Sequence, residues 1–252
     1  MKIGVFGDSY ADVSTKDENP QAWPCVVQHS LNAEVDYYAR SGTSMWWSYQ
    51  KFKEHYKKYD VIIFCFTSAT RWPSLPDEIE VGRQFNIGHT KDNSLLDKLN
   101  PFFFSLFPDK LREFLCGSIQ RDIVETCKNE DKYLVQVIPF IAKYSDQYRY
   151  DFDMYTNNFP IISGLDAISH KEVVLIDNKK INTGKLLRTT YSDHRACHLN
   201  TSNNKIVADW IIGCITDKKY DVNFECEKYN DWVWFDSTDS SISMTTLNLR
   251  RM

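Results

Sequence analysis

Short, continuous apolar runs are the feature that most constrains how this 252-residue chain can fold. Runs of strand length that are rich in Val and Ile are typical of strands buried on both faces of a parallel sheet. None of them approaches the roughly 18 consecutive apolar residues of a membrane span. The sequence predicts five such strands, at Lys2–Phe6, Glu34–Tyr38, Val61–Phe66, Tyr133–Ile138 and Val173–Ile176.

Segments with helical periodicity lie between or after these strands. Apolar side chains recur at helical spacing in Gln21–Asn32, Ser44–Tyr56 and Asn203–Thr216. Strands that alternate with helices are typical of a layered α/β fold. We therefore expect a three-layer α/β/α sandwich around a flavodoxin-like parallel sheet of about five strands.

The uneven spacing of the strands predicts insertions. The segment between Phe66 and Tyr133 is far longer than one crossover connection needs. We expect one domain over residues 1–216, with a helical insertion at 71–132 and a second insertion at 142–170. Residues 217–252 are expected to form a C-terminal extension that docks on its own domain or on a partner.

Composition argues against several classes of protein. The net charge of −4 and the scattered Lys and Arg residues do not suit a nucleic-acid partner. The 7 Cys include no CxxC pair, so buried reduced thiols are expected rather than a disulfide framework. The N-terminus shows no signal-peptide pattern, which predicts a soluble protein of the cytoplasm.

The residue usage also carries a hint about the source of the chain. Asn, Lys and Tyr are frequent and there are only 9 Gly, as in proteins of a phage or another AT-rich genome. A phage protein would act in the host cytoplasm or in the virion. The C-terminal extension would then bind a virion partner or a second copy of the chain.

A small hydroxyl stands at the tip of the first predicted strand, in Gly7-Asp8-Ser9. A serine is a weak nucleophile unless a base, a group that orients the base, and oxyanion donors lie beside it. Of the 6 His, His198 lies just before the last predicted helix, where loops reach the carboxyl ends of the strands. His194 is the competing base. The alternative for Gly7-Asp8-Ser9 is an ordinary turn, because turns use these residues constantly.

Three blocks of the sequence resemble those of the SGNH hydrolases, also called the GDSL esterase and lipase group. These are Gly7-Asp8-Ser9 after the first strand, Ser41-Gly42-Thr43-Ser44 after the second, and Asp193–Asn200 before the last helix. The resemblance covers residues 1–70 and 193–216, and leaves the middle of the chain and its tail uncovered.

The resemblance implies a role for each matching position. Ser9 would be the nucleophile and would donate its backbone N–H to the oxyanion, and Gly42 would be the second donor. His198 would be the general base, which takes the Ser9 proton and returns it to the leaving alcohol. For Asp8 we favour a structural role.

Two positions depart from the family pattern. The Asn that usually supplies a further oxyanion donor falls at Ala69, so Thr67 is expected to replace it. The alternatives are Ser68, Thr70 or Arg71 in its place, or no replacement of this donor. The residue three before His198 is Arg195 instead of Asp. Asp193 is therefore expected to orient His198, with a backbone carbonyl as the alternative.

The tight group of Asp193, His194, Cys197 and His198 also suggests zinc, but the spacing is irregular and a second ligand pair is missing. We expect neither a metal nor a cofactor. The expected activity is that of a serine esterase, an O-acetylesterase on carbohydrate, with Trp46 and Arg71 binding the substrate. The alternative, motivated by Ala69 and Arg195, is a non-catalytic protein of the same fold that binds glycans or builds a virion.

Overall fold

The computed structural model describes the sheet, its helices and several of the loops that join them. The described residues are 1–13, 20–67, 109–139, 159–165, 173–176, 179–182, 199, 201–220 and 222–226. Most of the two predicted insertions and most of the C-terminal extension lie outside the described residues.

Six parallel strands form the central sheet, in the order β2-β1-β3-β4-β5-β8. This order is that of a flavodoxin-like, doubly wound sheet, and it confirms the predicted fold class. The first four strands confirm the prediction almost residue for residue. The strands are β1 (Lys2–Gly7), β2 (Glu34–Ala39), β3 (Val61–Cys65), β4 (Tyr133–Ile138), β5 (Ile161–Ser163) and β8 (Asn223–Glu225).

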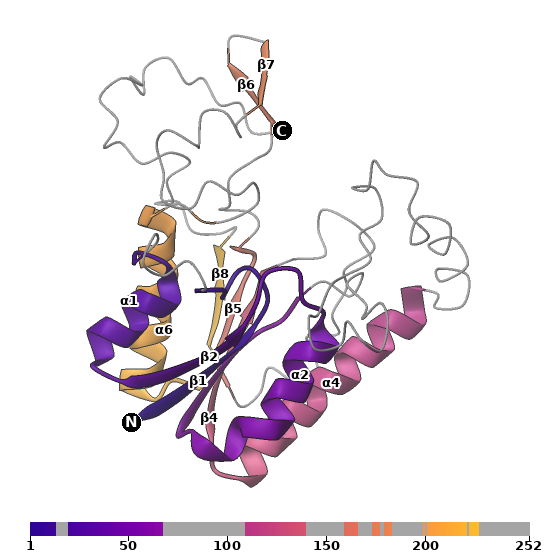
Figure 1. Ribbon diagram of the computed structural model, residues 1–252, viewed down its shortest axis with the longest axis vertical. Helices are drawn as coiled ribbons and strands as arrows, with labels where there is room; N and C mark the ends of the chain where they lie inside the picture. Colours follow the sequence, from indigo (N-terminus) through magenta and orange to yellow (C-terminus); the bar gives the residue numbers. More distant parts are fainter. Residues whose placement is uncertain are drawn as a thin grey trace.

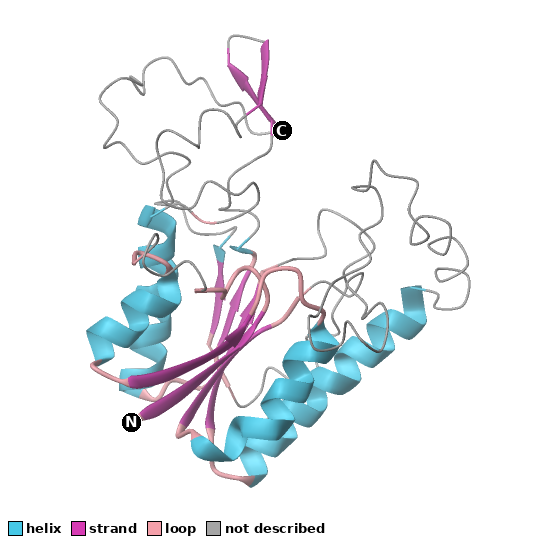
Figure 2. Cartoon of the chain, in the orientation of Figure 1, coloured by secondary structure: helices cyan, strands magenta, loops and turns pink. Residues whose placement is uncertain are grey.

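Helices cover both faces of this sheet and make the three predicted layers (Figure 1). Helices α1 (Trp23–Leu31) and α6 (Thr201–Asp217) pack side by side on one face. Helices α2 (Met45–His55) and α4 (Asp109–Asn129) lie on the other face, as Figure 2 shows. The short 3-10 helix η1 (Tyr56–Lys58) continues α2 towards β3.

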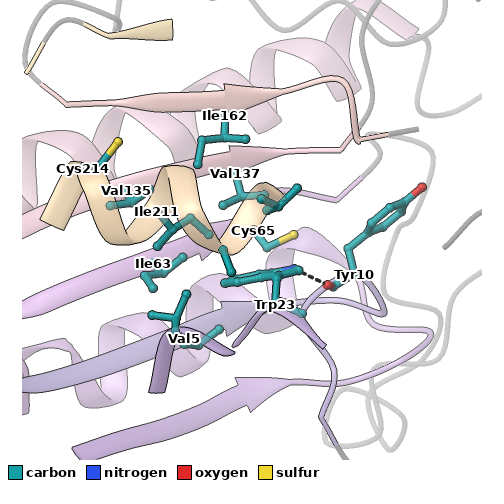
Figure 3. Packing of buried hydrophobic residues seen from close by; sticks show 14 of the residues in the cluster. Val5, Tyr10, Trp23, Ile63, Cys65, Val135, Val137, Ile162, Ile211 and Cys214 are labelled. Atoms are coloured by element: carbon teal, nitrogen blue, oxygen red, sulfur yellow. Dashed lines mark hydrogen bonds between the residues drawn. The ribbon is translucent and has the colours of Figure 1, made fainter. Parts of the chain in front are cut away.

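The two cores follow from the alternation of side chains along each strand. On β1, Ile3 and Val5 belong to the cluster under α1 and α6, whereas Phe6 belongs to the cluster under α2 and α4. Trp23 is fully buried in the first cluster, against the same face of the sheet (Figure 3). Burial on both faces explains why these strands are continuous apolar runs in the sequence.

One predicted strand lies in a different sheet. Val173–Ile176 (β6) pairs antiparallel with β7 (Lys179–Asn182) in a two-stranded sheet, so its assignment to the parallel sheet was wrong. The remaining two positions are taken by β5 and β8, which lie in segments expected to form an insertion and the C-terminal extension. Strands of three residues are too short for their periodicity to reveal them.

Helix α4 belongs to the helical layer, although it lies within the segment 71–132 that the sequence suggested as an insertion. It is 21 residues long and contacts both α2 and β4. It is therefore the crossover helix that leads the chain back to start β4, as parallel strands require. The domain boundaries otherwise stay a prediction.

A pair of buried amides lies between α4 and β4. Gln120 Nε2 donates to Gln136 Oε1 at 2.9 Å, and both side chains are shielded from solvent. Within the described residues, Gln120 Oε1 and Gln136 Nε2 have no hydrogen-bond partner. Removal of one member would leave the other buried and unpaired, which lowers stability.

The described cysteines are free thiols, and all of them except Cys25 are buried. Burial raises the pKa of the Cys127 thiol to about 12 and that of Cys214 to about 11. Both thiols are therefore protonated and unreactive at neutral pH. Cys197 lies outside the described residues.

Among the described helices, none is long and apolar enough to cross a membrane.

The glycine that ends β1 has no room for a side chain, which predicts a large effect of a single methyl group. A Cβ on Gly7 would lie 2.6 Å from Cys65 Cβ on β3, so we expect Gly7→Ala to lower the free energy of unfolding by about 1–3 kcal/mol. Gly117 on α4 is the matched control, because a Cβ there meets nothing within 4 Å. Gly117→Ala should raise the stability by about 0.5–1 kcal/mol. Urea denaturation measures both, and equal effects would contradict the packing of β1 against β3.

Candidate active site

The strand order places three of the predicted site residues at one end of the sheet. Strand β1 has β2 on one side and β3 on the other, so the connections leave it in opposite directions. Open α/β sheets bind ligands in the crevice outside the carboxyl ends of the strands at such a switch point. Ser9 follows β1, Gly42 follows β2 and Thr67 follows β3, so all three lie on loops at this end.

The turn that carries Ser9 is held by its own neighbours. Asp8 is fully buried, and its Oδ1 accepts a hydrogen bond from the Tyr10 backbone N–H at 3.1 Å. The Ala11 N–H donates to the Asp8 carbonyl at 3.0 Å and closes the turn. A short acidic side chain that bonds to backbone two residues on is a common turn device. In the described residues, Asp8 therefore stabilises the turn of Ser9, which is itself only 7% exposed; the sequence had favoured a different structural role for Asp8, as a charge near the start of the helix that follows.

The hydroxyl of Thr67 also stabilises the Ser9 turn, through Asp8. It donates to Asp8 Oδ2 at 2.6 Å, deep in the protein. A hydroxyl has a single proton, so Thr67 cannot also donate that proton to an oxyanion while it holds Asp8. In this arrangement the Thr67 side chain secures the Ser9 turn instead of replacing the missing Asn.

The Gly42 turn is joined to the end of β1. The Gly7 carbonyl accepts hydrogen bonds from the Arg40 backbone N–H at 3.3 Å and from the Ser48 hydroxyl at 3.1 Å. Thr43 Oγ1 lies 3.3 Å from the same oxygen. Gly42 itself has φ 83°, a left-handed conformation that glycine adopts without strain. Gly7, the residue before Asp8 and Ser9, therefore holds the turn that follows β2.

A second bond joins the same two loops further along. Asp12 is buried, and its Oδ2 accepts from the Ser41 backbone N–H at 2.7 Å. This short hydrogen bond joins a buried side chain to the backbone of the other loop. The loop of Ser9 and the loop of Gly42 are therefore fixed to each other at two points.

The block that carries the expected base and acid is described only at its end. Leu199, the residue after His198, is buried, and its carbonyl accepts from Asn204 Nδ2 at 3.0 Å. His198, Asp193 and His194 themselves lie outside the described residues, and their roles stay predictions.

The tryptophan pair at the start of α2 is divided between core and surface. Trp47 is buried, whereas Trp46 is 37% exposed and packs its ring beside Tyr49. Ser44 caps the helix by accepting from the Trp47 N–H, which directs the chain from the Gly42 turn into α2. Arg71, the other residue expected to bind substrate, lies outside the described residues.

No group of three or more His, Cys, Asp or Glu side chains suited to a metal occurs in the part of the chain that the structure describes. The Asp193–His198 group lies outside that part.

Sequence reasoning did not single out Asp12, Trp23 or Asn204, whose hydrogen bonds connect the loops. Their bonds connect residues far apart in the chain, such as Trp23 and Asn204 at a separation of 181, and local patterns carry no signal of such contacts.

The Thr67 hydroxyl allows a direct test of its role. We expect Thr67→Val to lower the free energy of unfolding by about 1–3 kcal/mol, because the buried Asp8 carboxylate loses a donor. Thr67→Ser keeps the hydroxyl and should keep most of the stability. The measurement is urea denaturation together with ester hydrolysis. A Thr67→Val variant of unchanged stability and lowered kcat would instead assign the hydroxyl to the oxyanion.

No protein-family model matches the sequence, and no curated protein matches it. Solved structures of similar arrangement include an acetyl xylan esterase, at 13% identity and TM-score 0.47, over 85% of this chain and 100% of that one. A psychrotrophic esterase from Pseudoalteromonas sp. matches at 11% identity and TM-score 0.46, over 86% of this chain and 97% of that one. A GDSL-like lipase from Bacteroides thetaiotaomicron matches at 11% identity and TM-score 0.45, over 86% and 89%. At these values, the function has to be inferred from the chain's own residues.

Proposed function

We propose that this protein is a serine esterase in which Ser9 is the nucleophile and His198 the general base. One observation carries the proposal. The Gly7 carbonyl just before the Ser9 turn accepts from the Arg40 N–H, and Asp12 just after it accepts from the Ser41 N–H, so the loops of Ser9 and Gly42 are held together at the switch point of a doubly wound sheet. A nucleophile and a backbone donor held together at this place can act on one carbonyl group.

In the first half of the reaction, Ser9 Oγ attacks the carbonyl carbon of the ester. His198 accepts the hydroxyl proton and passes it to the oxygen of the leaving alcohol as the carbon–oxygen bond breaks. The backbone N–H groups of Ser9 and Gly42 donate to the oxyanion of the tetrahedral intermediate. A site without the usual Asn donor would be slower by roughly 10²–10³-fold than one that has it.

In the second half, water attacks the acyl group on Ser9 while His198 accepts a proton from the water. The same proton then returns to Ser9 Oγ, and the carboxylic acid leaves. Asp193 orients His198 in both halves. These steps use only side chains and backbone of the protein, and no cofactor takes part.

The proposed substrate is a carbohydrate that carries a small acyl group, such as an acetate ester. Trp46 supports this class because its exposed ring lies at the start of α2, four residues beyond Gly42. An exposed tryptophan face beside a catalytic turn suits the apolar face of a sugar ring. Arg71 is the second residue proposed to bind the substrate.

The role of Trp46 predicts a change in substrate binding. We expect Trp46→Ala to raise KM for an acetylated xylo-oligosaccharide by about tenfold with little change in kcat, since the ring binds ground state and transition state alike. Tyr220→Ala is the matched control, because Tyr220 is exposed but packs against Tyr133 at the amino end of β4. A KM that rises equally in both variants would remove Trp46 from the binding site.

Covalent labelling tests the proposed nucleophile. The protein is incubated with a fluorophosphonate probe, and mass spectrometry of the digested protein locates the label. We expect the label on Ser9, none on a Ser9→Ala variant, and full labelling of Ser118→Ala, which removes an exposed hydroxyl on α4. Failure to label Ser9, with p-nitrophenyl acetate left intact, would support the alternative of a non-catalytic glycan-binding or virion protein.

A further inference from the structure

A single buried amide side chain connects the block of His198 to the opposite side of the site. Asn204 lies near the start of α6 and is 5% exposed. Its Nδ2 donates to the Leu199 carbonyl at 3.0 Å, and its Oδ1 accepts from the Trp23 backbone N–H at 2.9 Å. Both ends of the amide are therefore used, one for the segment that leads into α6 and one for the first turn of α1.

Trp23 extends the connection to the nucleophile turn. Its ring is fully buried, and its Nε1 donates to the Tyr10 carbonyl at 2.7 Å (Figure 3). Tyr10 is the residue after Ser9, and its own N–H is held by Asp8. Hydrogen bonds thus run from Leu199 through Asn204 and Trp23 to Tyr10.

The two ends of this connection are the chain neighbours of the two proposed reacting residues. Consecutive Cα atoms are about 3.8 Å apart, so fixing Leu199 and Tyr10 holds the chain at one residue from each proposed reacting residue. A set of hydrogen bonds that served only to stabilise α6 would not need to continue through Trp23 to Tyr10 in the Ser9 turn. Asn204 also has a structural role, because its Oδ1 accepts from the backbone N–H of Trp23. This N–H lies at the start of α1, where backbone N–H groups have no partner within the helix.

We infer that Asn204 is a positioning residue, which holds the segment of His198 in register with the Ser9 turn through Leu199 and Trp23. The inference rests on the proposed function. It predicts that loss of the bond to Leu199 slows the chemical step without weakening substrate binding, because Asn204 and Trp23 are both buried side chains. A displacement of about 1 Å between reacting groups can cost about 10²-fold in rate.

The Asn204→Asp variant separates the two bonds of this side chain. A carboxylate still accepts from the Trp23 N–H but has no proton to donate to the Leu199 carbonyl. At pH 8 we expect kcat for p-nitrophenyl acetate to fall about 10- to 10²-fold while KM stays unchanged. Hydrogen exchange in the peptide that contains Leu199 should be faster than in the wild type.

Protonation provides a rescue that a purely structural loss would not show. A neutral carboxyl group donates one O–H hydrogen bond, so the protonated side chain of the Asn204→Asp variant can form both the bond to the Leu199 carbonyl and the bond from the Trp23 N–H. Burial raises the pKa of a carboxyl group. The ratio of variant to wild-type kcat should therefore rise as the pH is lowered from 8 to 5.

Three comparisons decide the outcome. Gln136→Leu breaks the buried amide pair on the other face of the sheet, so it should lower stability yet keep wild-type kcat. Trp23→Phe removes the donor to Tyr10 and should lower kcat with unchanged KM, which covers the case in which Asn204→Asp does not fold.

If Ser9→Ala loses activity but both Asn204→Asp and Trp23→Phe keep it, the inference is wrong and the proposed function stands. If Ser9→Ala keeps activity, the proposed function fails, and the inference fails with it.

Discussion

A Ser9→Ala variant is expected to lower kcat for ester hydrolysis by roughly 10⁴–10⁶-fold. Alanine offers no nucleophile, so the ester can react only with water placed beside the remaining oxyanion donors. The turn should survive, because the variant keeps the bond from the Tyr10 N–H to Asp8 Oδ1 and the bond from the Ala11 N–H to the Asp8 carbonyl. Steady-state hydrolysis of p-nitrophenyl acetate measures the loss.

The matched control for this variant is Ser118→Ala, which removes a hydroxyl that donates to the Phe114 carbonyl within α4. It should leave kcat and KM at their wild-type values. A urea denaturation curve for Ser9→Ala that superimposes on the wild type excludes unfolding as the cause of lost activity. Wild-type turnover by a folded Ser9→Ala protein would show that Ser9 is not the nucleophile.

His198→Gln is expected to lose about as much activity as Ser9→Ala, because a nucleophile and its base act as one unit. Glutamine keeps a polar side chain but cannot take up the Ser9 proton. The double variant should therefore be no slower than either single variant. The pH profile of the wild type should show kcat/KM falling at acid pH, because a protonated imidazole cannot accept the Ser9 proton.

His194→Gln provides the comparison that identifies the base. His194 lies four residues earlier in the same block, and its replacement should keep wild-type activity if His198 is the base. Activity lost in His194→Gln and retained in His198→Gln would assign the base to His194. Additive losses in the double variant of Ser9 and His198 would show that the two residues do not act together.

The fold was predictable as far as the strands were long and buried on both faces. Strands β1, β3 and β4 read as continuous apolar runs because helices cover both sides of the sheet. Strands β5 and β8 have three residues each and carry no comparable signal. Val173–Ile176 has the composition of a buried strand, but strand composition does not say which sheet a strand joins. In the structure this strand pairs with β7, the next strand along the chain, in a separate two-stranded sheet.

The candidate site was likewise predictable from the sequence only in part. The positions of Ser9 and Gly42 directly after two strands are visible in the sequence, and parallel strands bring such loops to one end of a sheet. The partner of the Thr67 hydroxyl was not predictable, since the same side chain can serve an oxyanion or Asp8. The structure gives this proton to Asp8, because β3 runs beside β1 and brings Thr67 to the carboxylate.

By itself, the sequence determined the alternation of strands and helices and the placing of Gly7-Asp8-Ser9 at a strand end, because hydrophobic periodicity and turn chemistry are local. The tertiary structure decided which loops meet. The Ser41 N–H on Asp12, and the Trp23 N–H on Asn204, join residues that no local pattern relates. The bond between Trp23 and Asn204 forms because α1 and α6 pack together on one face of the sheet. Both bonds follow the rule that buried polar groups find partners wherever the fold supplies them.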